Sequence, residues 1–231
     1  MHIPDGFLST GTASVLVIAA ITVGTVAVNK VKQLFSAREK VMSLKTPEGA
    51  EFNEVAITKL TKKGKTTIFK IAILGAFIFS MQMLNFPIAQ GTSGHLLGGV
   101  LVAVMLGPWI GFLVIAVILI VQSLLFADGG LLAMGANIIN MGLIGAVGGY
   151  YIYQYAFKKI KKVFPAAFLA AWASVVLASA GCALELALSG TIAFNDVFIN
   201  MVGIHCLIGL TEGAITVAVL GYLKHEEKED E

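Results

Sequence analysis

Three nitrogen donors lie together at the start of the chain, in the segment Met1-His2-Ile3-Pro4-Asp5-Gly6-Phe7-Leu8. The terminal amine of Met1 and the main-chain amide of His2 can close a five-membered chelate ring on a metal ion. The same amide and Nδ1 of the His2 imidazole can close a six-membered ring. If the amide loses its proton, the three nitrogens lie in one plane, which suits Ni²⁺, Cu²⁺ or Co²⁺ better than Mg²⁺ or Ca²⁺. Residues 1–10 therefore predict a metal-chelating segment that lacks one ligand.

A second histidine, His95, is the candidate for the missing fourth ligand. It follows the run Gly91-Thr92-Ser93-Gly94, and Gly98 and Gly99 come soon after it. These small residues leave room for another segment to approach the imidazole. The alternative is that His95 lies in a loop at the membrane edge and that the N-terminus is frayed, with His2 there by chance.

The composition indicates a polytopic membrane protein. Of its 231 residues, 57% are hydrophobic and 13% are charged, and the mean hydropathy is +0.87; soluble domains carry about 25% charged residues. The apolar runs have about the 20 residues that a helix needs to cross the hydrocarbon layer. Gly, Asp and Lys separate these runs, which favours helices over a barrel. The partner expected from composition is the lipid bilayer, not nucleic acid.

Seven transmembrane helices are expected, and together they form a single all-α membrane domain over residues 1–231. A charged cytoplasmic linker over residues 29–67 separates the first two, and it is longer than the other connections. The expected helices lie at about 11–28, 68–84, 95–106, 109–126, 132–157, 165–188 and 197–223.

The basic residues predict the orientation of this bundle. All 16 Lys and Arg residues fall within residues 29–70, residues 158–162 and the C-terminal tail. Cytoplasmic loops are the ones enriched in Lys and Arg, so the N-terminus is expected outside and the C-terminus inside. The two cysteines, Cys182 and Cys206, lie in apolar runs and are expected to be buried thiols rather than a disulfide or a metal clamp.

Ionisable and polar groups inside membrane helices are candidates for function. His205 and Glu212 are seven residues apart and share a face of the last helix. His205 could orient a metal ligand, and the alternative for the whole set is hydrogen bonding that holds the bundle together. The residues that could support the ligands or line the interior are Asn85, Ser93, His205, Asn137, Glu185 and Glu212.

The segment Met1–Leu8 resembles the start of the substrate-capturing membrane subunits of cobalt and nickel energy-coupling-factor (ECF) transporters, the CbiM/NikM family. The run Asn85-Phe86-Pro87-Ile88, followed by Gly91-Thr92-Ser93-Gly94-His95, is similar to the second motif of that family. The resemblance covers nearly the whole chain, and these two motifs are specific. Weaker matches are Asp128-Gly129-Gly130, Gly135-Ala136-Asn137, Asn140-Met141, Glu185, His205 and Glu212.

The resemblance implies that Ni²⁺ or Co²⁺, as transported substrate, is held by the amine of Met1, the amide and imidazole of His2, and the imidazole of His95. It also implies partners: a coupling transmembrane subunit, cytoplasmic ATPase subunits and often a small auxiliary membrane subunit, in the plasma membrane of a prokaryote. The chain would then be the S component of an ABC-type permease and no enzyme. Lys63-Gly64-Lys65-Thr66 is similar to the end of a phosphate-binding loop, but Lys59 stands where that loop needs glycine.

Two other functions stay open from the sequence. Gly91–Gly94 matches the Gly-x-Ser-Gly of rhomboid-type intramembrane proteases, with Ser93 as nucleophile and His205 as base; that interpretation leaves Met1–Leu8 unexplained. A stand-alone secondary metal transporter is the other alternative, although such transporters often show internal repeats and no clear repeat is found here.

Overall fold

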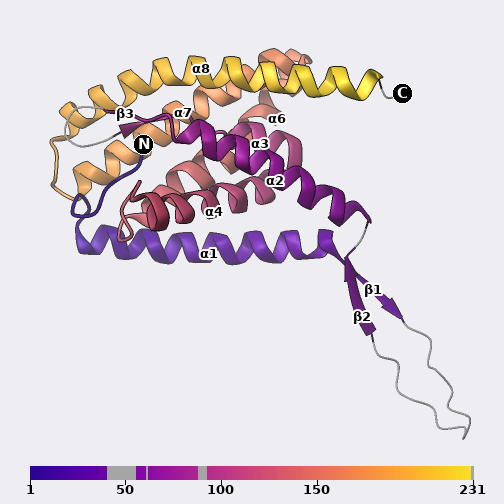
Figure 1. Cartoon of the computed structure of the whole chain (residues 1–231). Coiled ribbons are helices and arrows are strands. Elements are labelled where there is room, and N and C mark those ends of the chain that lie inside the picture. The colour runs from indigo at the N-terminus through magenta and orange to yellow at the C-terminus, as the bar shows by residue number, and fades with distance from the viewer. Residues whose placement is uncertain (41–55, 61, 88–92, 230–231) are drawn as a thin grey trace, which may run out of the picture.

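The structure is a computed structural model that describes residues 1–40, 56–60, 62–87 and 93–229, and most of these residues are helical (Figure 1). Two short antiparallel strand pairs accompany the helices: β1 (Ser36–Lys40) with β2 (Ala56–Leu60), and β3 (Phe86–Pro87) with β4 (Ser93–Gly94). The predicted helical bundle is confirmed. Its helices are α1 (Thr10–Phe35), α2 (Lys62–Gln82), α3 (Gly99–Leu106), α4 (Pro108–Phe126), α5 (Met134–Asn137), η2 (Ile138–Gly148), α6 (Gly149–Ile160), α7 (Val163–Leu188) and α8 (Phe194–Glu229).

Five of the described helices are long and apolar enough to cross a membrane, namely α1, α2, α4, α7 and α8. The predicted helix at 132–157 is present as the consecutive pieces α5, η2 and α6, with wider π-type turns in η2. The predicted helix at 95–106 begins only at Gly99, because Gly98 has a left-handed backbone with φ of 71°. The remaining eight residues of α3 are too short to cross alone, since a span needs about 20 residues.

The first helix and the second helix both extend into the predicted linker. Helix α1 continues to Phe35 instead of ending near Val28, and α2 begins at Lys62. Lys and Gln are good helix formers, so a helix can continue past its apolar stretch. The strands β1 and β2 then form a hairpin that projects from the bundle (Figure 1). Residues 41–55 and 61 of the predicted linker lie outside the described residues.

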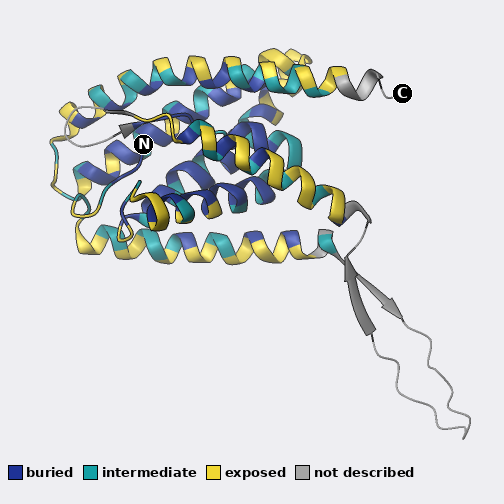
Figure 2. Ribbon diagram, in the orientation of Figure 1, coloured by how far each residue is buried: buried dark blue, intermediate teal, exposed yellow. Residues whose placement is uncertain are grey.

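The core of the bundle includes the N-terminal segment. Met1 and Ile3 belong to the same buried cluster as residues of α3, α4, η2 and α7. Figure 2 shows buried residues gathered between the helices, whereas much of α1 is exposed. Helix α4 is the most enclosed span, with 56% of its most apolar window buried, against 11% for α1. The N-terminus therefore lies among the central helices, and α1 lies at the periphery.

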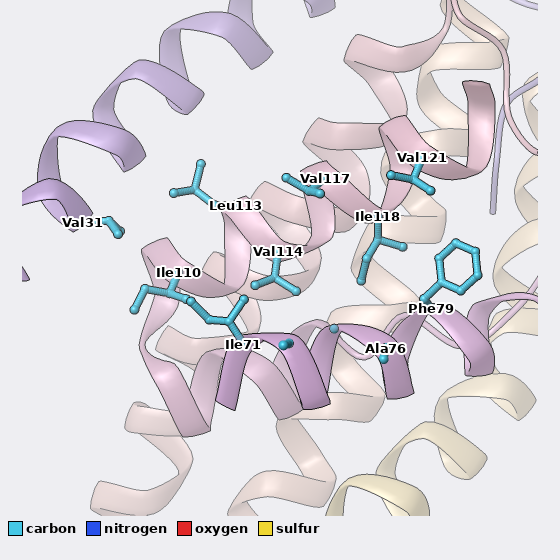
Figure 3. Close-up of a pocket in the computed structure, with 12 residues that line it drawn as sticks. Val31, Ile71, Ala76, Phe79, Ile110, Leu113, Val114, Val117, Ile118 and Val121 are labelled. Atoms are coloured by element: carbon cyan, nitrogen blue, oxygen red, sulfur yellow. The ribbon is translucent and has the colours of Figure 1, made fainter. Parts of the chain in front are cut away.

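An apolar pocket lies between α1, α2 and α4 (Figure 3). Its walls come from α1 through Val31, from α2 through residues such as Ile71 and Phe79, and from α4 through residues such as Val114 and Ile118. Every side chain that lines it is a hydrocarbon or a glycine. A transition-metal ion needs nitrogen, oxygen or sulfur ligands, so this pocket is not the metal site.

Candidate metal centre

The N-terminal segment is packed into the bundle and is not a frayed end. The exposed fraction is 0% for Met1, 3% for His2 and 0% for Ile3, and Figure 1 places the N-terminus inside the bundle. Chain termini are usually poorly ordered unless something holds them. The burial of this terminus therefore directs attention to the contacts that hold it.

Asn137 of α5 binds the main chain of Ile3 through two hydrogen bonds. The N–H of Ile3 donates to Oδ1 of Asn137 over 2.8 Å, and its carbonyl accepts from Nδ2 of Asn137 over 3.2 Å. The same carbonyl accepts from the N–H of Gly130 over 2.9 Å. Asn137, which the sequence places among the interior polar residues, thus fixes the residue next to His2. This contact sets how deeply the first two residues enter the bundle.

Asp5 and Phe7 fasten the segment further out. The carboxylate of Asp5 accepts from the N–H of Leu131 over 3.1 Å and from the N–H of Leu132 over 2.7 Å. The hydroxyl of Thr191, in the loop between α7 and α8, donates to the carbonyl of Phe7. The segment is therefore tied to two different connections of the bundle.

The imidazoles of His2 and His95 lie against each other. Their ring centroids are 4.4 Å apart and their planes are inclined by 54°. Oδ1 of Asp128 lies 2.8 Å from Nδ1 of His2 but is not aligned for a hydrogen bond: neither ring nitrogen of His2 has an aligned partner among the described residues. Asn85 donates to the same oxygen of Asp128 over 3.4 Å. Asp128, on the loop that follows α4, thus lies next to His2 and accepts from Asn85.

The tautomer of His95 follows from its hydrogen bond. Its Nδ1 lies 2.8 Å from the carbonyl of Leu96, and a carbonyl can only accept, so Nδ1 carries the proton in the neutral ring. Nε2 then presents a lone pair, and this buried atom has no partner among the described residues. His205 has the same arrangement, with Nδ1 2.7 Å from the carbonyl of Met201 and Nε2 buried and unpartnered.

Burial disfavours positive charge throughout this cluster. It lowers the pKa of the Met1 amine from 8.0 to about 5, although the nearby Cys182 and Asp128 act against that shift. Burial also lowers the pKa of His2 and holds the pKa of His95 well below its usual range, and in both cases positive charge on the terminal amine adds to the effect. Near neutral pH the amine and the two imidazole rings are therefore uncharged, which is the form in which they bind a metal.

Side chains alone do not form a metal site in the part of the chain that the structure describes. Among the described residues, no three His, Cys, Asp or Glu side chains come together in a group that could hold a metal ion. Two imidazoles and the buried chain terminus do come together, through Met1, His2 and His95. The arrangement can bind a metal only if the terminal amine and the main-chain amide contribute, as the chelate predicted from the first residues requires.

The remaining predicted residues are divided between this cluster and the wider bundle. Glu212 of α8 accepts from two main-chain N–H groups just before α3, so it acts next to His95. Glu185 of α7 instead accepts from Asn140 over 2.6 Å, which is the helix-to-helix bonding expected in a bundle. Ser93 begins β4, but its side chain lies outside the described part. The predicted thiols are both free: Cys182 is buried and Cys206 is half-buried.

The roles of Asp5 and Asp128 were not predicted from the sequence. Both are residues of turns, and the run Asp128-Gly129-Gly130 stood out only as a turn and as a weak match to the family. The feature of the sequence that could have indicated them is an acidic residue in a turn next to glycines. Glycine lets another segment approach closely, and a Cβ atom at Gly130 would overlap Asp5. That feature indicates a close contact but does not say which segment makes it.

The whole chain is similar to known metal transport proteins. A sequence model of the CbiM family, described as the cobalt uptake substrate-specific transmembrane region, matches residues 2–229. The chain belongs to the CbiM family. Family membership makes it a substrate-specific membrane component of cobalt or nickel transport, consistent with a transporter and not an enzyme. Relatives of this CbiM-family chain are named as nickel or cobalt transport proteins, and Ni²⁺ and Co²⁺ are among the metals that the predicted chelate suits.

Individual relatives extend over most of this CbiM-family chain. A putative fused nickel transport protein of Archaeoglobus fulgidus is 35% identical over 96% of the chain, and the chain spans only 65% of that relative's length. A putative metal transport protein of Haloquadratum walsbyi is 33% identical over 96% of the chain and 89% of the relative. A crystal structure of a transition metal transporter superimposes with a TM-score of 0.82 at 30% identity, covering 99% of this chain and 94% of that one.

These relatives favour transport over the protease alternative. In the structure, Nδ1 of His205 contacts the carbonyl of Met201, and Gly91 and Thr92 of the Gly-x-Ser-Gly match lie outside the described residues. The side chain of Ser93, the nucleophile of that interpretation, also lies outside the described part of the chain. The contacts of the first five residues, by contrast, have no role in the protease interpretation.

Proposed function

We propose that this chain captures Ni²⁺ or Co²⁺ from outside the cell as the substrate-specific component of an ECF-type uptake transporter. The proposed ligands are the amine of Met1, the deprotonated amide and Nδ1 of His2, and Nε2 of His95. The metal is the transported substrate, and the chain catalyses no bond change. The observation that carries the proposal is the burial of the terminal amine and His2 directly beside His95, whose Nε2 has no partner among the described residues.

The properties of these donors suit late first-row metals. Four nitrogen ligands, three of them from one planar chelate, favour low-spin Ni²⁺. Affinity at a given nitrogen site rises from Co²⁺ to Ni²⁺, so we expect tighter binding of Ni²⁺ than of Co²⁺. The contacts of Ile3 and Asp5 hold the terminus in place before the metal arrives, which reduces the ordering that binding would otherwise require.

The proposed orientation in a prokaryotic plasma membrane has seven spans, with the N-terminus outside and the C-terminus inside. Its support is the confinement of Lys and Arg to alternate connections and the position of the β1–β2 hairpin at the same end of the bundle as the end of α8 (Figure 1). In this account the transport partners are a coupling transmembrane subunit and cytoplasmic ATPase subunits, with or without a small auxiliary membrane subunit. These partners would drive release of the metal to the inside.

Equilibrium Ni²⁺ binding by purified variants tests the proposal. His95→Ala removes one of the four ligands and is expected to weaken binding by at least about tenfold. Tenfold is about the smallest loss of metal affinity that is typical when a group that only supports a ligand is removed. His2→Ala removes the six-membered ring and is expected to weaken binding further. His225→Ala, an exposed histidine near the end of α8, is the matched control. Wild-type affinity in His95→Ala would refute the ligand assignment.

A further inference from the structure

One peptide group next to His95 is bound at both of its ends. The carbonyl of Leu96 accepts from Nδ1 of His95 over 2.8 Å. The N–H of the same peptide group, which belongs to Leu97, donates to Oε2 of Glu212 over 2.9 Å. A continuous path of two hydrogen bonds and one peptide group therefore joins the carboxylate of α8 to the imidazole of His95.

The surroundings hold this peptide group firmly. Oε1 of Glu212 accepts from the N–H of Gly98 over 2.6 Å, so both carboxylate oxygens are engaged. On the other side, Nε2 of Gln82 donates to the carbonyl of Leu97 over 2.7 Å. A Cβ atom at Gly98 would lie 2.7 Å from the side chain of Ile78, so the backbone there has little room to move.

Glu212 is a buried carboxyl group inside a membrane span. Its exposed fraction is 4%, it lies within the span of α8, and the described residues offer it no ion-pair partner. A carboxyl group inside a membrane span is expensive to keep and commonly functional. Its two oxygens are directed at the turn that carries His95 rather than at another charged side chain.

We propose that Glu212 is a positioning residue for the metal site, acting on His95 through the Leu96–Leu97 peptide group. The inference rests on the proposed function, because it takes Nε2 of His95 as a metal ligand. We call the path from Glu212 through the Leu96–Leu97 peptide group to His95 the relay. It keeps the proton of His95 on Nδ1, leaves the lone pair on Nε2, and fixes the direction in which Nε2 points. It also makes the imidazole a stronger donor to the metal.

The physical basis is the mutual polarisation of hydrogen bonds in series. A carboxylate that accepts from a peptide N–H increases the negative charge on the carbonyl oxygen of that peptide, and the next bond in the chain strengthens. Metal-binding histidines usually donate their other N–H to a carboxylate or carbonyl, and loss of that partner typically costs 10–100-fold in metal affinity. Here one peptide group stands between the carboxylate and the imidazole.

The test measures the Ni²⁺ dissociation constant and the visible absorption spectrum of the bound Ni²⁺ for four proteins: wild type, Glu212→Gln, Glu185→Gln and His95→Ala. Glu185→Gln is the matched control, because Glu185 is also a buried carboxylate of a span but accepts from Asn140. Glu212→Gln is expected to weaken binding about tenfold or more and to shift the spectrum toward that of His95→Ala. Glu185→Gln is expected to keep both the wild-type affinity and spectrum.

The outcomes separate the relay from the proposed function. If wild type binds Ni²⁺ and Glu212→Gln keeps the wild-type affinity and spectrum, the relay is wrong and the capture function stands. If wild type itself binds no Ni²⁺, the capture function fails and the relay fails with it. A loss of affinity equal in Glu212→Gln and Glu185→Gln, with no spectral change in either, would show a merely structural effect and would also overturn the relay.

A measurement on the unaltered chain covers the case in which Glu212→Gln does not fold. Planar low-spin Ni²⁺ is diamagnetic, so amide signals near the site stay observable by nuclear magnetic resonance. With ¹⁵N-leucine labelling, the relay predicts that the Leu97 amide proton shifts when Ni²⁺ binds, more than the amide of the exposed Leu188 does. An unchanged Leu97 signal in the Ni²⁺-bound protein would overturn the relay.

Discussion

At the scale of single residues, we expect the terminal amine of Met1 to govern how the proposed site responds to pH. Its pKa is about 5 in the folded chain, against 8.0 for an ordinary terminus, because it is buried. Between pH 5 and pH 8, a terminus that has left the bundle (undocked) binds more protons than a terminus buried in it (docked). Docking of the segment is therefore strengthened as pH rises from 5 to 8 and is weakened as pH falls through that window.

The same shift predicts the number of protons that Ni²⁺ displaces at pH 7. A docked amine is already unprotonated, so only the amide of His2 must lose a proton, and about one proton is released per ion. An exposed amine of ordinary pKa would add nearly one more, giving about two. Calorimetry in buffers of different ionisation enthalpy measures this number, and a value near two would contradict the buried amine.

Asn137 is the residue whose loss should most directly loosen the segment. Asn137→Leu keeps a side chain of similar size but removes both bonds to the main chain of Ile3. A buried N–H left without a partner costs about 1–3 kcal/mol, so Ni²⁺ binding should weaken by roughly five- to 150-fold through poorer docking. Asn200→Leu is the control, because the side chain of Asn200 donates to the carbonyl of Asp196 in the same helix. An equal loss in both variants would argue against a specific clamp.

At the scale of elements, the turn between α4 and α5 must approach the N-terminal segment closely. A Cβ atom at Gly130 would overlap the main chain and carboxylate of Asp5, so Gly130→Ala should displace the segment and weaken Ni²⁺ binding by at least about tenfold, as for a lost supporting contact. Gly24→Ala on α1 adds the same methyl group where nothing lies within 4 Å and should leave binding unchanged. Wild-type binding by Gly130→Ala would show that this contact is not needed.

Local sequence features predicted some elements and could not predict others. The apolar runs located α4 and α7 to within two residues, because hydrophobicity marks a span directly. The end of α1 was missed, since Lys30 and Lys32 read as linker although a helix tolerates them. The late start of α3 depends on the left-handed backbone of Gly98, and a sequence shows a glycine without showing its conformation.

The candidate site was predictable where chemistry is local and not where it depends on tertiary contacts. Met1 and His2 are neighbours in the chain, so a chelate formed by them can be predicted from their order. His95 can be predicted as its neighbour because glycines beside it leave room, and the structure does place the rings of His2 and His95 together. Asp5 meets Leu132 across 127 residues, and Glu212 meets Leu97 across 115. Pairings at such separations are set by how the helices pack, which no local pattern records.

At the scale of the whole molecule, the proposed orientation determines which connections face the outside. In a chain whose own two cysteines are replaced, Ala193→Cys in the loop before α8 should react with a membrane-impermeant thiol reagent in intact cells. Lys162→Cys in the basic connection between α6 and α7 should react only after permeabilisation. Both positions are exposed in the structure, so burial would not explain a difference. The reverse pattern would contradict the proposed orientation and place the metal site on the inner side.

Blocking the amine of Met1 tests most directly whether the chain terminus itself binds the metal. Acetylation of this amine leaves every residue in place but removes the lone pair that closes the five-membered ring. Acetylation of the exposed side chain of Lys224 instead is the control. We expect equimolar Ni²⁺ binding by the native chain and the control, and at least about a hundredfold weaker binding by the chain acetylated at Met1, the upper end of the loss for a group that supports a ligand. Equal binding by all three proteins would contradict the terminal chelate.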